Sequence, residues 1–70
     1  MRVEVEVLGR DKKVLEISEG HTLGDIARII NIRRVEYVPS VNNKIVTWEY
    51  KVRDGDIVKF IPVVSGGYPI

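Results

Sequence analysis

Residues 2–7 alternate strictly between charged and apolar side chains, and Leu8 follows them. Val3, Val5 and Val7 fall on one face of an extended chain, and the charged residues between them fall on the other. This period of two predicts a strand with one buried face. A short polar turn at residues 9–12 separates it from a second predicted strand at residues 13–18. The two strands are expected to form a hairpin.

The apolar period then changes from two to about 3.6 residues. Thr22 is a suitable N-cap, and Asp25 stands three residues later, where it completes a pair resembling a capping box. The apolar residues that follow share one helical stripe: Leu23, Ile26, Ala27 and Ile30. We therefore predict one helix that lies across the sheet and ends near Asn31.

Residues 35–41 predict a third strand that is less regular than the first. Pro39 lacks a backbone donor, so at least one side of this strand should be unpaired near it. Asn42 and Asn43 predict a hairpin turn, because asparagine tolerates left-handed backbone angles better than most residues. Residues 44–48 then predict a short fourth strand.

The last predicted strand follows the Asp-Gly turn at residues 54–55, where glycine accepts a positive φ. Only Lys59 and Pro62 interrupt the apolar run at residues 57–64, which favours a central strand buried on both faces. Pro62 is expected to end regular pairing. Two residues of this strand are expected to face the helix, namely Val58 and Phe60.

The order strand, strand, helix and three strands predicts an α+β fold. The last strand can lie parallel to the first, with the helix on one face of a mixed sheet. This is the β-grasp arrangement of ubiquitin. We expect one domain at residues 1–65 and a flexible tail at residues 66–70, because Gly66 and Gly67 carry no side chain that packs.

The final segment resembles the ThiS and MoaD sulfur-carrier proteins, which close with a GD-x-V strand, a proline and an x-Gly-Gly terminus. The matching residues are Asp54, Gly55, Asp56, Val58, Phe60, Pro62, Val64, Gly66 and Gly67. The similarity extends to the helix start at residues 22–23 and to the turn at residues 41–46. One departure is that Tyr68, Pro69 and Ile70 follow the glycine pair.

The resemblance implies a sulfur carrier that is not an enzyme and has no catalytic residues or bound cofactor of its own. A ubiquitin-activating-type enzyme would use ATP to adenylate Gly67, and sulfur would then convert it to a thiocarboxylate. A sulfur-accepting synthase for thiamine, molybdopterin or tRNA thiolation would be the second partner. We predict that a peptidase first cuts after Gly67. The alternative is that this member is never activated.

The candidate site residues fall into two sets. The tail would be recognised through Pro62, Val64, Gly66 and Gly67, since the two glycines can pass a narrow channel in any backbone conformation. An apolar partner surface on the last strand is predicted at Ile57, Phe60, Ile61 and Val63.

Two other functions use the same residues differently. A ubiquitin-like modifier would join Gly67 to lysines of other proteins, whereas a purely structural β-grasp interaction domain would not use the glycines at all. The sequence selects neither the pathway nor the oligomeric state. Exposed strand edges leave pairing near Pro39 open.

Composition limits the other classes of function. Seventy residues suffice for one small domain with a thin core. A formal net charge of +1 argues against nucleic acid as a partner, and the arginines near the helix end are interpreted as a solvated face rather than an RNA site. The absence of cysteine excludes disulfides and thiolate metal sites, and His21 is interpreted as a loop residue. Without a signal peptide or membrane span, the expected location is the cytoplasm.

Overall fold

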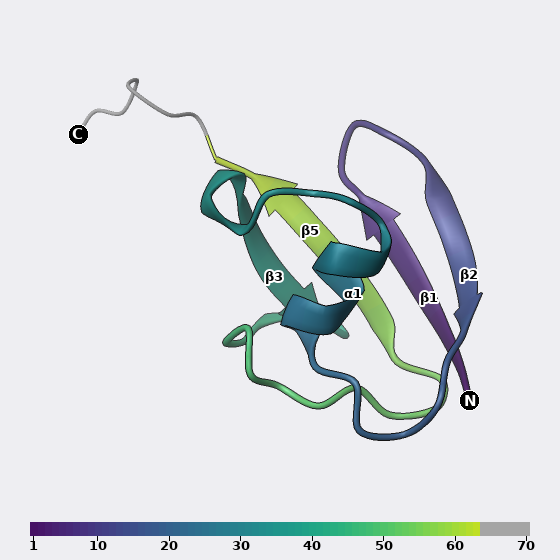
Figure 1. Cartoon of the computed structure of the whole chain (residues 1–70). Coiled ribbons are helices and arrows are strands. Elements are labelled where there is room, and N and C mark those ends of the chain that lie inside the picture. The colour runs from purple at the N-terminus through teal and green to yellow at the C-terminus, as the bar shows by residue number, and fades with distance from the viewer. Residues whose placement is uncertain (64–70) are drawn as a thin grey trace.

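The computed structural model describes residues 1–63, which form one mixed sheet and one α-helix. The elements are β1 (Arg2–Val7), β2 (Lys12–Glu16), α1 (Leu23–Ile29), the 3₁₀ helix η1 (Arg34–Glu36), β3 (Tyr37–Val41), β4 (Lys44–Ile45) and β5 (Ile57–Pro62). The strands follow the order β2-β1-β5-β3-β4, with β5 between β1 and β3 (Figure 1). β5 runs parallel to β1, and the other neighbouring pairs are antiparallel. The predicted α+β fold with a central last strand is confirmed.

The predicted start of α1 is confirmed by a complete capping box. The backbone N–H of Asp25 donates to Thr22 Oγ1 at 3.2 Å, and the backbone N–H of Thr22 donates to the Asp25 carboxylate at 3.0 Å. The second bond lowers the pKa of Asp25 below its ordinary value, since it stabilises the ionised form. The helix ends at Ile29 with Ile30 as its C-cap, and Asn31 then takes a φ of 65°.

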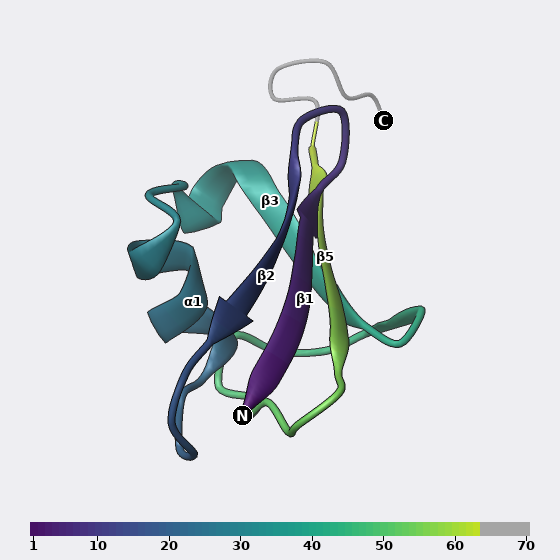
Figure 2. The same cartoon turned by 90° about the vertical axis from the view of Figure 1, so that its right-hand side faces the viewer.

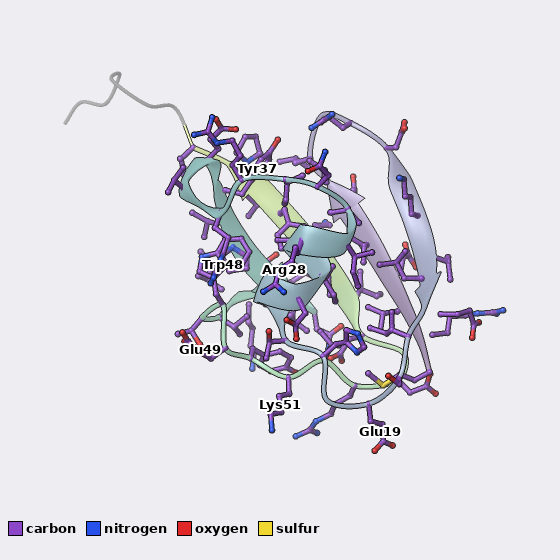
Figure 3. All side chains as sticks on the ribbon, in the orientation of Figure 1. Glu19, Arg28, Tyr37, Trp48, Glu49 and Lys51 are labelled. Carbon is purple, nitrogen blue, oxygen red and sulfur yellow. The ribbon has the colours of Figure 1, made fainter. Side chains whose placement is uncertain are left out.

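The core lies between α1 and one face of the sheet. In the parallel pairing, Val5 lies beside Val58 and Val7 lies beside Phe60, so the apolar phases of β1 and β5 coincide. The buried cluster comprises Val3, Val5, Val7, Leu23, Ile26, Val41, Val52, Val58 and Phe60. Trp48, which Figure 3 labels, covers the margin of this cluster. Its ring stacks on that of Phe60, with 5.6 Å between the ring centroids. The prediction that Val58 and Phe60 face the helix is confirmed.

β5 is buried on one face rather than on two, so that part of the prediction was wrong. Burial alternates along the strand: Val58 and Phe60 are fully buried, whereas Ile57, on the other face, is 45% exposed to solvent. Figure 2 shows α1 on one face of the sheet, and within residues 1–63 no helix covers the other face. The strand ends at Pro62, as predicted.

The predicted third strand begins two residues too early. The backbone N–H of Glu36 donates to the carbonyl of Arg33, which closes η1 instead of extending the strand. β4 pairs only with Ser40 and Val41, and the Pro39 carbonyl accepts one further bond from the Val46 N–H at 3.3 Å. Before Pro39, that side of β3 has no strand partner within residues 1–63, so the expected unpaired side near Pro39 is confirmed. Pairing of another chain near Pro39 stays a prediction.

The predicted fourth strand, residues 44–48, is reduced to Lys44–Ile45. Beyond it the chain leaves the sheet and crosses the start of α1. There the Trp48 carbonyl accepts from the Gly24 N–H, and the Tyr50 carbonyl accepts from the Leu23 N–H, each at 3.0 Å. The first turn of a helix has donors without helical partners, and the loop satisfies them. Because its carbonyl bonds to the start of α1, Trp48 lies outside the sheet.

The residues predicted for tail recognition at Val64, Gly66 and Gly67, and the predicted domain boundary at residue 65, lie outside the described residues. Tyr68, Pro69 and Ile70 lie outside them as well.

Candidate functional site

Four apolar side chains gather at the carboxyl end of β5, on the sheet face away from α1. This exit patch consists of Leu8, Val38, Ile61 and Val63. Val38 lies directly opposite Ile61, and the Leu8 N–H donates to the Phe60 carbonyl at 3.0 Å, which continues the β1–β5 pairing by one residue. Leu8 and Val63 are each 43% exposed, while Val38 and Ile61 are half-buried. The patch therefore borders the point where the chain passes beyond Val63.

The four residues predicted for a partner surface do not stay together. Ile61 and Val63 belong to the exit patch, whereas Ile57 lies at the start of β5, about 13 Å along the strand. Phe60 is completely buried beneath α1 and Trp48, so its assignment to a surface was wrong. Of the residues predicted for tail recognition, only Pro62 is described. It is exposed and pairs with Tyr37, which Figure 3 labels at this end of the sheet.

Sequence reasoning missed two members of the exit patch, Leu8 and Val38. The alternation in β1 carried a signal for Leu8, because it falls in phase with the charged, outward residues rather than with Val7. Pro39 pairs with the buried Phe60, so its neighbour Val38 falls on the opposite face of the sheet, away from the helix. An apolar residue at an outward position is the pattern that would have found both.

The opposite end of β5 is held by an anchor network around Asp56, which is 7% exposed. Its carboxylate accepts from the Arg53 N–H at 2.8 Å, from the Asn42 amide at 3.2 Å and from the Tyr50 hydroxyl at 3.3 Å. Its backbone carbonyl accepts from the Glu4 N–H at 3.1 Å. A buried carboxylate with this many donors is satisfied in one arrangement only, so the network fixes where β5 starts.

Asn42 joins this network to the β3–β4 turn. Its amide oxygen accepts from the Ile57 N–H at 3.0 Å, and its own backbone N–H donates to the Ile57 carbonyl at 2.8 Å. The φ angles of Asn42 and Asn43 are 51° and 71°, which confirms the predicted turn. On the other side, the Arg2 N–H donates to the Asp54 carboxylate at 2.7 Å. Three distant segments thus hold the first residues of β5 in register.

A family model described as the ThiS family matches residues 3–67, nearly the whole chain and the glycine pair with it. The chain belongs to the ThiS family. This agrees with the resemblance that the Asp-Gly-Asp strand, Pro62 and the two glycines indicate. Family membership supports a sulfur-carrier role in cofactor biosynthesis.

A solved structure shares the fold of this ThiS-family chain. It is the protein–protein complex of subunits 1 and 2 of molybdopterin-converting factor from Helicobacter pylori 26695. The matched chain superposes with a TM-score of 0.68 at 18% sequence identity, over 96% of this chain and 100% of that chain. At this identity the match establishes the β-grasp fold.

The described part of this ThiS-family member holds no cluster suited to catalysis by metal. Within residues 1–63, no group of three His, Cys, Asp or Glu side chains gathers. The Nδ1 atom of His21 lies 2.8 Å from the Ser18 carbonyl, which makes it a loop residue as predicted. The helix described here is too short to cross a membrane.

Proposed function

We propose that this ThiS-family chain carries sulfur on the carboxyl group of Gly67. The carboxylate of Gly67 attacks the α-phosphorus of ATP on an activating enzyme and releases pyrophosphate. A sulfide nucleophile supplied by the partner then attacks the carbonyl carbon, and AMP leaves. The product is a thiocarboxylate, which a synthase for thiamine, molybdopterin or tRNA thiolation accepts. The chain contributes the acid, and ATP is bound by its partner.

The observation that carries this proposal is the family match through Gly67, combined with the fixed position of β5. The anchor network sets the register of β5, and the strand runs from there through the centre of the sheet to Pro62. A tail that must enter another protein's active site benefits from a rigid base, because its starting point is then defined. Glycines at residues 66 and 67 suit a narrow channel, since they have no Cβ.

The exit patch is the surface on which we place the partner. It presents apolar side chains from β3 and β5 and from the residues that directly follow β1 and β5, next to the point where the chain passes beyond Val63. Burial of such a patch against a partner is favourable by about 25 cal/mol for each Å² removed from water. The structural neighbour was solved as a complex of two subunits. By analogy, the synthase partner would cover this face and receive the tail.

Tyr68, Pro69 and Ile70 follow Gly67, so Gly67 has a free carboxyl group only after its peptide bond to Tyr68 is cut. We therefore place a peptidase cut after Gly67 before activation, as with ubiquitin precursors. A protein modifier would use the same carboxyl group to form an isopeptide bond with lysine. The two functions differ in the acceptor, and only the modifier would leave a Gly-Gly remnant on lysines of other proteins.

The direct test is to incubate the full chain and a form that ends at Gly67 with ATP and the cognate activating enzyme, and to follow pyrophosphate release. The Gly67-terminated form should be adenylated and the full chain should not. A Gly67-terminated variant carrying G66V is the matched control, because its carboxyl group is intact but its tail is wider. Equal adenylation of both forms, or of neither, would contradict the proposal.

A further inference from the structure

The outer edge of β2 is open. Within residues 1–63, β2 pairs with β1 only and ends the sheet on that side (Figure 1). Four of its five residues are exposed, and Val14 is 57% exposed. The strand contains no proline and no bulge in its pairing with β1, which are two of the features that usually block a free edge.

The pattern of backbone bonds identifies which groups on this edge are available. The Val7 N–H donates to the Asp11 carbonyl, and the Ile17 N–H donates to the Met1 carbonyl. In antiparallel pairing the bonded residues alternate, so odd-numbered residues of β2 bond to β1. The N–H and carbonyl groups of Lys12, Val14 and Glu16 therefore point outward.

We propose that a second copy of this chain pairs with this edge, with a two-fold axis through Val14. In that antiparallel register Val14 faces Val14 of the second copy, and Lys12 faces its Glu16. These are the residues whose backbone groups point outward, so each facing pair would exchange two backbone hydrogen bonds. The edge is thus complementary to itself in both backbone and charge.

The charges along the sheet support this register. On the face away from α1, Lys59 lies beside Glu6, which lies beside Lys12. With the second copy in place, the row continues through its Glu16 to its Arg2, since these two residues pair and form an ion pair at 3.0 Å. Charge then alternates across the whole row, and opposite charges on facing strands are favourable.

Neighbouring registers lack this complementarity. A shift by two residues in one direction places Lys12 opposite Val14 and Lys13 opposite itself. A shift in the other direction places Val14 opposite Glu16 and moves Lys12 opposite Ser18. Like charges directly opposite each other are unfavourable, and charge next to valine gains nothing. Only the register centred on Val14 forms both Lys12–Glu16 pairs.

This dimer would leave the proposed carrier site accessible. The exit patch lies on β3 and β5 and on the residues that directly follow β1 and β5, whereas the new contact is confined to β2. The two-fold axis reverses the direction of β1, and β5 runs parallel to β1, so the two copies would direct their tails to opposite ends of a continuous sheet. One dimer would then offer two independent tails.

The sharpest test is a charge-exchange experiment followed by sedimentation velocity over about two decades of concentration. The unmodified chain should associate into a dimer. K12E makes residues 12 and 16 both acidic, and E16K makes them both basic. Like charges would then face each other across the two-fold axis, so each variant alone should self-associate at least tenfold more weakly. An equimolar mixture should restore the dimer, because both facing pairs again join opposite charges. The ion pairs lost within each chain are exposed and contribute little to folding.

K44E on β4 is the matched control for net charge, and it should leave association unchanged. Weakening by K44E equal to that by K12E would overturn the proposal, as would an unmodified chain that stays monomeric. A mixture of K12E and E16K that remains monomeric would overturn it too.

A second test reports the register itself. The chain has no cysteine, so V14C supplies a single thiol on the axis. Facing residues in a hydrogen-bonded antiparallel pair have Cα atoms about 5.5 Å apart, which suits a disulfide. Under mild oxidation V14C should form a covalent dimer several-fold faster than I45C, whose thiol would stand on the exposed β4 edge. Equal rates, or a faster rate for I45C, would contradict the register.

Discussion

The two ends of β5 differ in almost every physical property. At its start, the buried carboxylate of Asp56 collects donors from Asn42, Tyr50 and Arg53. At its end, Leu8 and the other members of the exit patch offer apolar surface, and one backbone bond from the Val63 N–H to the Glu36 carbonyl is the last contact described. One end therefore determines position, and the other is available for recognition.

This difference separates two tasks that a small carrier must combine. A directional hydrogen-bond network fixes the register of a strand, because a slip would leave buried groups unpaired. An apolar patch binds a partner through contacts that are less directional. Substitutions at the two ends should therefore act on different measurements, stability at the start and binding at the end.

The largest effect is expected for D56A at the start of β5. Three donors would lose their acceptor in a site that is 7% exposed, so we expect the free energy of unfolding to fall by about 3 kcal/mol. Denaturant unfolding followed by Trp48 fluorescence measures this change. D54A is the control, since its exposed carboxylate accepts one bond and its loss should cost about 1 kcal/mol. Equal losses in the two variants would contradict the role of Asp56.

Asn42 should come next, because both its side chain and its backbone matter. N42A removes the amide and places alanine at a φ of 51°, and we expect a loss of about 2 kcal/mol. N42G removes the amide but tolerates the backbone angle, so it should cost about 1 kcal/mol. The difference between the two unfolding free energies measures the backbone contribution. A larger loss for N42G than for N42A would contradict this account.

At the end of β5, L8D should change binding rather than stability. Leu8 is 43% exposed, so an aspartate there remains solvated in the free protein but places a charge within the proposed partner contact. We expect affinity for the activating enzyme or synthase to fall about tenfold, which corresponds to about 1.4 kcal/mol. Calorimetric titration measures it. I45D is the control, because Ile45 is 70% exposed on β4, outside the exit patch, and affinity should be unchanged.

The smallest effect is a pH dependence from the cap of α1. The Thr22 N–H bond lowers the pKa of Asp25 in the folded protein below the ordinary value of 3.8. The contribution of Asp25 to stability is therefore complete above about pH 3.8 and is lost as the pH falls through the lower, folded pKa. The difference in unfolding free energy between the wild type and D25N should shrink over that range. A difference that grows as the pH falls would contradict the sign.

Local patterns predicted most of the fold. The alternation in β1, the capping box at Thr22 and the turn at Asn42 each depend on neighbours within a few residues, and all three are confirmed. The central place of β5 followed from its apolar run and from the connection rules for parallel strands. Each of these features is determined mainly by residues close to it in the sequence.

Contacts between residues far apart in the sequence could not be predicted from these local patterns. The sequence marks Asn42 as a turn residue and places Asp56 directly after the Asp-Gly turn, but nothing in it shows that Asn42 and Asp56 bond to each other. The predicted fourth strand included Trp48. Its stacking on Phe60 and its carbonyl's bond from the Gly24 N–H at the start of α1 are contacts between distant parts of the chain, which the local pattern does not show. The one-sided burial of β5 likewise depends on a single helix covering one face of the sheet.

Intact mass spectrometry of the protein isolated from its native cells would show whether Gly67 bears the reacting carboxyl group. We expect a chain that ends at Gly67, part of it with one carboxyl oxygen replaced by sulfur. A protein that retains Tyr68, Pro69 and Ile70 with an ordinary carboxylate, also in cells that are actively making the sulfur-containing product, would contradict it.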